Sequence, residues 1–179
     1  KNFCFDFLTN SQDFRRMTHT TPSHVGDVQQ AIDTARNLGA VVVVAAGNSN
    51  INAAGFTPAN CEGVITVGAT TSNGTRASFS NFGSVVDLSA PGVGIVSTVN
   101  ASSWNPGIDN AYVSYNGTSM ATPHVSAALA LMLSVNPRMT ALQAETYIKK
   151  SVRVFAPSAC TVTGGCGTGI LKANRGLAT

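Results

Sequence analysis

The run Val41-Val42-Val43-Val44-Ala45-Ala46 contains six consecutive apolar residues, and four of them are β-branched. A strand that is apolar on both faces is typical of a parallel sheet that helices cover on both sides. Two further apolar runs follow, at Val64–Val67 and at Val85–Leu88. The pattern predicts an α/β layered fold, with residues 41–46 as a central strand that has neighbours on both sides.

Three helices are predicted around these strands. Apolar residues recur at helical spacing from Thr21 onward, and Gly39 can end that helix. A second helix, over about 118–133, is apolar nearly all round and is therefore expected to be buried. A third is expected over about 140–152, because Thr140 and Gln143 have the spacing of a capping box.

Composition excludes several classes of protein. The chain has 179 residues, enough for one domain with its own core, and its 44% hydrophobic content excludes a disordered protein. The net charge of +3 is small and scattered, so no nucleic-acid partner is expected. The longest apolar run, Val125–Val135, is too short to cross a membrane, so no membrane partner is expected.

The four cysteines form an even count in a chain with few lysines and glutamates, which favours a secreted, oxidised protein. Four buried thiols in a cytosolic protein are the alternative. Five residues separate Cys160 from Cys166, a segment short and flexible enough to bring the two Cβ atoms together. A disulfide is therefore predicted between these two, which leaves Cys4 and Cys61 as a second candidate pair. Residues 1–16 contain no apolar core of signal-peptide length, so an export signal would lie upstream.

The first candidate catalytic residue is Ser119, which follows Gly117 in the first turn of a hydrophobic helix. A helix start gathers unpaired N–H groups and the positive end of the helix dipole. A nucleophilic serine there would have its own N–H available to a developing oxyanion. Pro123 is expected in the first turn, where the missing N–H costs nothing. The alternative is that Thr118-Ser119 only caps the helix.

The second candidate is Asn48, which follows Gly47 at the end of the first predicted strand. In open α/β sheets the functional crevice lies at the carboxyl ends of the strands. An asparagine amide there is a neutral donor that can meet an oxyanion. The alternative is an ordinary Gly-Asn turn.

Together these stretches resemble the subtilases, the subtilisin-like serine proteases. Gly-Thr-Ser-Met-Ala-Thr-Pro-His-Val (117–125) is similar to their nucleophile motif, and Val-Ala-Ala-Gly-Asn (44–48) to their oxyanion-asparagine motif. Four further stretches follow the family's order: 56–59, 64–69, 77–83 and 87–92. The resemblance covers residues 25–179 and leaves 1–24 as an unmatched leader. It implies a three-layer subtilisin-like fold with a mainly parallel sheet covered by helices, incomplete at its N-terminal side.

The resemblance also implies roles for individual residues. Ser119 would be the nucleophile and the Asn48 side chain the oxyanion donor of a secreted serine endopeptidase acting on polypeptides. The pocket for the residue before the scissile bond would be lined by Ala45, Ala46 and Gly47. The chemistry requires no cofactor. Some subtilases bind a cation near the aspartate that matches Asp87, so a structural Ca²⁺ is considered there; a solvated aspartate at a strand end is the alternative.

The family's aspartate and histidine motifs are missing from the sequence. In subtilases, Asp-Ser/Thr-Gly and His-Gly-Thr-His precede the serine, and neither occurs here. His24 lies directly before the first predicted helix, and in the family this position comes well after the catalytic histidine. His124 belongs to the nucleophile motif, and His19 lies in the leader. The base and its carboxylate are therefore expected from another segment or chain, and this chain alone is expected to be nearly inactive. A fragment, a processed chain and a frameshifted reading all fit this pattern. The alternative function is a non-catalytic subtilase remnant or a partner-binding fragment.

Overall fold

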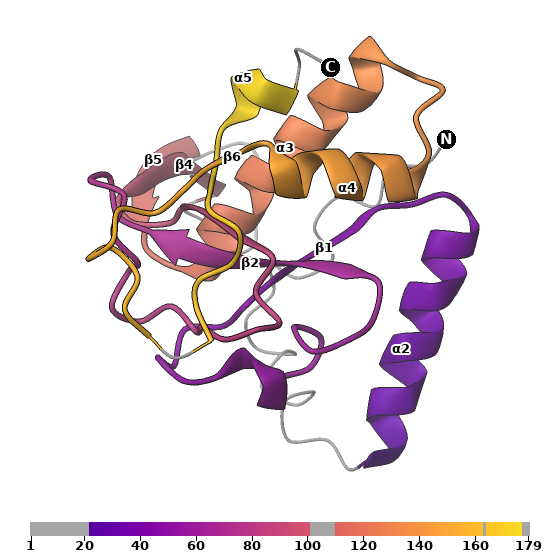
Figure 1. The fold of residues 1–179 in the computed structure, drawn as a ribbon, viewed down its shortest axis with the longest axis horizontal. Coiled ribbons are helices and arrows are strands. Elements are labelled where there is room, and N and C mark those ends of the chain that lie inside the picture. The colour runs from indigo at the N-terminus through magenta and orange to yellow at the C-terminus, as the bar shows by residue number, and fades with distance from the viewer. Residues whose placement is uncertain (1–21, 101–109, 163, 177–179) are drawn as a thin grey trace.

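The structure is a computed structural model that describes residues 22–100, 110–162 and 164–176 (Figure 1). Its helices are α2 (Pro22–Asn37), the 3-10 helix η1 (Ala53–Gly55), α3 (Thr118–Val135), α4 (Ala141–Lys150) and α5 (Ala173–Gly176). Its strands are β1 (Val42–Ala45), β2 (Val64–Thr70), β3 (Leu88–Pro91), β4 (Ile95–Asn100), β5 (Asn110–Tyr115), β6 (Val152–Arg153) and β7 (Ile170–Leu171). Most of the predicted leader, with Cys4 and His19, lies outside the described residues.

The main sheet has the order β1-β2-β3-β7-β6. Strands β1, β2, β3 and β7 run parallel, and β6 pairs antiparallel with β7. Strands β4 and β5 form a separate antiparallel hairpin. Within the described residues β1 pairs only with β2, so the expected second neighbour of β1 is not part of what the structure describes.

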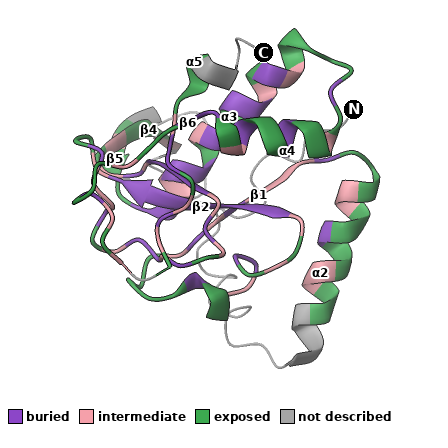
Figure 2. Cartoon of the chain, in the orientation of Figure 1, coloured by how far each residue is buried: buried purple, intermediate pink, exposed green. Residues whose placement is uncertain are grey.

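Helices cover both faces of this sheet because alternate side chains of β1 point to opposite sides. Val44 and Val42 pack with Ile32 of α2, whereas Val43 packs against the cluster that includes Val125 of α3. Helix α3 contacts β1, β2 and β3, and α4 packs on α3. Figure 2 shows β2 buried along its length and α2 largely exposed. The predicted mainly parallel α/β architecture is confirmed.

The predicted end of α2 and the predicted start of α4 are confirmed. Gly39 adopts a φ of 87°, and its N–H donates to the Arg36 carbonyl while the Ala40 N–H donates to the Ala35 carbonyl. This pair of bonds ends α2 in the manner of a Schellman motif. Thr140 and Gln143 form the predicted capping box of α4.

Two expectations about the elements were wrong, and one element was missed. The third strand begins at Leu88, where the apolar run 85–88 ends, because Val85 and Val86 pack in a loop cluster with Ala46 and do not join the ladder. Pro123 lies inside α3, beyond its first turn. A proline there removes the N–H that would bond the carbonyl four residues earlier, that of Ser119. The β4–β5 hairpin was not predicted.

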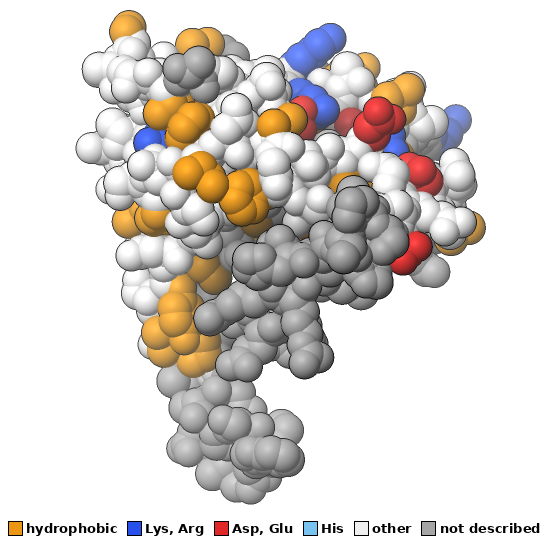
Figure 3. Space-filling model, turned by 90° about the horizontal axis from the view of Figure 1, so that it is seen from below, with side chains coloured by type: hydrophobic (Ala, Val, Ile, Leu, Met, Phe, Trp, Pro, Cys, Tyr) orange, Lys and Arg blue, Asp and Glu red, His pale blue; other side chains and the backbone are white. Residues whose placement is uncertain are grey.

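Helix α3 is, among the described residues, the one helix long and apolar enough to cross a membrane by length and composition alone. A core helix passes the same test, and α3 packs on three strands of the sheet. In the view of Figure 3 most acidic and basic side chains gather toward one side, and hydrophobic side chains are spread over the rest of the described surface. The exposed large hydrophobic residues come from separate elements, among them Leu38, Val96, Tyr112 and Val154.

An ion pair joins α2 to α4 across the molecule. The Arg36 guanidinium donates to both carboxylate oxygens of Glu145 and to the carbonyl oxygen of Gly63. The Arg36 side chain is 24% exposed and that of Glu145 is 9% exposed, so water is largely excluded from the carboxylate. A Cβ atom on Gly63 would overlap the Arg36 side chain, so the guanidinium passes close over this glycine.

Candidate active site

Ser119 is the second residue of α3, at the carboxyl end of the parallel strands. The chain reaches the helix through Gly117, whose N–H donates to the Gly92 carbonyl at 2.8 Å. The N–H groups of a first helical turn have no intrahelical acceptor. The Ser119 N–H is therefore available to a group outside the helix, and its half-buried side chain is reachable from solvent.

Asn48 lies in the loop that leaves β1. Its Oδ1 accepts from the Thr118 N–H at 2.8 Å and from the Thr118 hydroxyl at 2.9 Å. The same hydroxyl accepts from the Gly47 N–H at 3.2 Å. Because Thr118 supplies two donors to the carbonyl end of the amide, the orientation of the Asn48 side chain is fixed. Among the described residues its Nδ2 has no hydrogen-bond acceptor.

The two predicted donors both lie close to Gly117. A Cβ atom placed on Gly117 would lie 3.4 Å from Asn48 Nδ2 and 3.7 Å from Ser119 N, so the two nitrogens are near one another on the same side of this glycine. The Met120 sulfur also lies 3.4 Å from that point. Two neighbouring N–H donors of this kind are what an oxyanion hole requires. The structure thus brings together Ser119 and Asn48, which are far apart in the sequence.

A general base for Ser119 is not found among the described side chains. His124 Nδ1 lies 2.9 Å from the Met120 carbonyl oxygen on its own helix. His24 belongs to the first turn of α2. No described histidine or carboxylate forms a hydrogen bond with the Ser119 hydroxyl.

The three residues predicted to line a substrate pocket lie at the end of β1 and in the loop after it. Ala46 is fully buried, and Ala45 and Gly47 are half-buried. The Ala46 N–H donates to the Val67 carbonyl of β2, which fixes this backbone to the sheet. Their role in binding substrate stays a prediction.

Asp87 does not have the surroundings of a cation site. One carboxylate oxygen accepts from the Thr66 N–H at 2.8 Å, and the other lies 2.7 Å from Lys149 Nζ. The ammonium group thus occupies the place next to the carboxylate where a cation would bind. No group of three or more His, Cys, Asp or Glu side chains in the described parts of the chain could hold a metal ion. The residues present do not fit the calcium site considered from the sequence.

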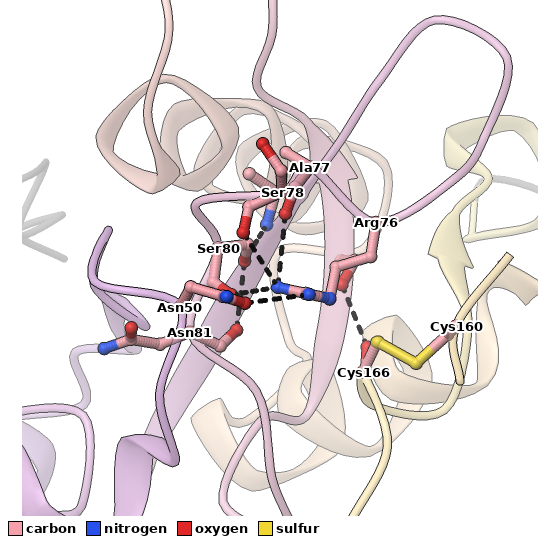
Figure 4. Close-up of a disulfide and its surroundings, with 10 residues drawn as sticks. Asn50, Arg76, Ala77, Ser78, Ser80, Asn81, Cys160 and Cys166 are labelled. Carbon is pink, nitrogen blue, oxygen red and sulfur yellow. Dashed lines mark hydrogen bonds between the residues drawn. A yellow bond between two sulfur atoms is a disulfide. The ribbon is translucent and has the colours of Figure 1, made fainter. Parts of the chain in front are cut away.

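Cys160 and Cys166 form a disulfide across the loop that follows β6 (Figure 4). The Cys166 carbonyl accepts from the buried Ser89 hydroxyl at 2.9 Å, which ties this loop to β3. Cys61 carries a free thiol, and burial, with a smaller effect from the Asp33 charge, raises its pKa. The second candidate pair has no support here, since Cys4 lies outside the described residues.

Two residues that hold the site together were not among the catalytic or binding residues predicted from the sequence. Thr118 is fully buried and orients the Asn48 amide. Asn81, also fully buried, binds the loop on which Asn48 lies. The sequence signal for Asn81 is the stretch 77–83, which contains it and resembles a family motif.

Comparison with known proteins gives consistent results. A family model described as the subtilase family matches residues 10–169. The chain is 51% identical over 151 residues to an extracellular protease of Xanthomonas campestris, an alignment that covers 84% of this chain and 25% of that protein. Subtilisin Savinase of Lederbergia lenta is 38% identical over 142 residues, which are 79% of this chain and 49% of that protein.

A solved structure of proteases from Pseudoalteromonas arctica superposes with a TM-score of 0.77 at 41% sequence identity, covering 84% of this chain and 45% of that chain. The chain therefore spans between about a quarter and a half of the length of the relatives it matches.

Proposed function

This chain belongs to the subtilase family of serine proteases, and we propose that it contributes the nucleophile and the oxyanion hole of a secreted endopeptidase. The observation that carries the proposal is that Asn48 Nδ2 and Ser119 N lie close together beside Gly117, and we take this place as the oxyanion point.

In this proposal Ser119 Oγ attacks the carbonyl carbon of a polypeptide substrate and its proton passes to a general base. The substrate oxygen becomes negative and is held by the Asn48 amide and the Ser119 N–H. The intermediate then collapses, the C–N bond breaks, and the leaving amine takes the proton. Water hydrolyses the acyl group from Ser119 and restores the hydroxyl.

The general base and the carboxylate that orients it come, in this proposal, from a segment other than the described residues. Two observations support this. The described residues place no histidine at Ser119, and the outer edge of β1, next to the Asn48 loop, has no partner among them. Relatives described as extracellular proteases support a location outside the cell for the active protein.

A fluorophosphonate probe tests the nucleophile, because the probe reacts fast only with an activated serine hydroxyl. This chain alone is expected to label no faster than an ordinary serine, and the protein with its base and carboxylate is expected to label fast. Ser119→Ala should abolish fast labelling, and Asn48→Ala should reduce peptide hydrolysis by about 10²–10³-fold. Ser126→Ala, on the same helix, is the matched control and should change neither.

Two results would contradict the proposal. Fast labelling that persists in Ser119→Ala would place the nucleophile elsewhere. Strong proteolysis by the pure chain that Ser119→Ala abolishes would show that the chain contains its own base. Absence of labelling in every form of the protein would favour the non-catalytic alternative.

A further inference from the structure

The Asn81 side chain is 1% exposed and lies beneath the loop that carries Asn48. Its Oδ1 accepts from the N–H groups of Ser49 and Ile51 at 3.0 and 3.2 Å, and its Nδ2 donates to the Ala46 carbonyl at 2.9 Å. Its own main-chain N–H donates to the Gly47 carbonyl at 2.8 Å. All four bonds therefore end on residues 46–51.

The segment that carries Asn81 is itself fixed to the sheet. The Ser80 hydroxyl accepts from the Ala69 N–H of β2 at 2.9 Å, and the Ala77 N–H donates to the Ala69 carbonyl at 2.9 Å. Arg76 adds a second connection to the loop, because its Nη2 donates to Asn50 Oδ1 at 2.9 Å (Figure 4). Asn81 is thus a short link between a rigid strand and the Asn48 loop.

Gly47 lets the loop approach Asn81 closely. Its φ is 103°, in the region that favours glycine, and a Cβ atom there would overlap Asn81 Nδ2. Thr118 holds the Asn48 side chain from the helix side, and Asn81 holds the two peptide groups that flank Asn48 from the sheet side. Main chain and side chain of Asn48 therefore have separate anchors.

We propose that Asn81 is a positioning residue that keeps the Asn48 amide at the oxyanion point, an inference that rests on the proposed function. Preorganised donors act only if they stay within a fraction of an ångström of the developing charge, and a misplacement of about 1 Å can reduce the rate about 10²-fold. The four hydrogen bonds of Asn81 end on residues 46–51 and none of them reaches Ser119, so its effect on the reaction would pass through Asn48.

The first test uses this chain and needs no enzymatic activity. Amide hydrogen exchange is measured by NMR in the wild type, in Asn81→Ala and in the control Asn60→Ala. Asn60 binds the Ala54 carbonyl in a neighbouring loop through the same kind of amide. In Asn81→Ala the Ser49 and Ile51 amides should exchange at least about tenfold faster, beyond any change common to all amides. A uniform acceleration, or no change at these two amides, would overturn the proposal.

The second test is a double-mutant cycle in the protein that holds its full catalytic set. Asn81→Ala should lower kcat about tenfold or more and leave KM within about twofold. In the Asn48→Ala background it should have no further effect on kcat, because it acts through Asn48. An equal loss in both backgrounds would show a merely structural role and overturn the proposal. If Asn81→Ala does not fold, Asn81→Ser, which removes the amide and adds no buried charge, replaces it in the cycle.

The two tests separate the inference from the proposed function. If the wild-type protein hydrolyses no peptide in any form, the proposed function fails, and the exchange measurement still decides whether Asn81 fixes the Asn48 loop.

Discussion

Replacing Arg36 with alanine should lower the free energy of unfolding by about 2–3 kcal/mol. The change removes the partner of a carboxylate that is 9% exposed, and losing one member of a buried ion pair costs about 3–5 kcal/mol. Exposed pairs contribute at most about 1 kcal/mol. Arg36 is 24% exposed and also binds the Gly63 carbonyl, so we place the effect below the fully buried range.

Urea denaturation of four variants measures this effect. Glu145→Gln keeps the shape of the side chain and an oxygen acceptor for the guanidinium, so it should cost only about 1 kcal/mol. The double variant Arg36→Ala/Glu145→Gln should be more stable than Arg36→Ala, because it leaves no charge unpaired in the interior. Arg138→Ala, at an exposed arginine, is the control and should stay within about 0.5 kcal/mol of the wild type.

The order of the variants by free energy of unfolding tests whether the ion pair stabilises the fold. If Arg36→Ala is no less stable than the double variant, the cost does not come from a stranded carboxylate. If Arg36→Ala costs no more than Arg138→Ala, the ion pair does not hold α2 to α4, and the reasoning from burial fails.

Four further predictions concern the cysteines and the sheet. Replacing Cys160 and Cys166 together by serine should lower the unfolding free energy by about 2 kcal/mol, as chain entropy gives for a separation of six residues; urea denaturation that shows no loss contradicts this. Burial and the Asp33 charge raise the pKa of the Cys61 thiol, so alkylation of Cys61 should reach half its maximal rate at a higher pH than alkylation of a free cysteine. Asp33→Asn should lower that pH. Peptide mass spectrometry measures the alkylation. The Cys61 thiol has a higher pKa in the folded chain than in the unfolded chain. The free energy of unfolding should therefore fall as the pH rises above the thiol pKa of the unfolded chain. The purified chain should also associate or bind a dye for apolar surfaces, since β1 has an unpaired edge among the described residues; a monodisperse monomer that unfolds cooperatively without binding dye refutes this.

Much of the fold could be predicted because its signals are local. The valine run of β1 is apolar on both faces, and the Thr140-Gln143 spacing marks the start of α4. The β4–β5 hairpin was not predicted because its residues mix polar and apolar side chains without a clear period. The apolar run at 85–88 was misread because burial in a loop cluster and burial in a strand leave the same composition.

The candidate site was predictable only through motif resemblance. Ser119 and Asn48 could be identified because one lies at the start of a helix after Gly117, the other follows Gly47 at the end of a strand, and both match a family motif. The cation hypothesis at Asp87 stays a prediction, although the Lys149 ammonium beside the carboxylate does not favour it. No local pattern reveals this pair, because Lys149 is distant in the sequence. Asn81 was missed for the same reason, since its bonds reach across about thirty residues to a loop.

The contact between Asn48 and Thr118 joins residues 70 positions apart in the chain. Closing so long a loop costs conformational entropy that no local structure offsets, and contacts of high sequence separation slow folding. The helices α3 and α4 can begin to form from neighbouring residues, but the two donors meet only after the sheet has assembled between them. The Asn48–Thr118 contact is therefore expected to form late, after the elements that carry the two residues.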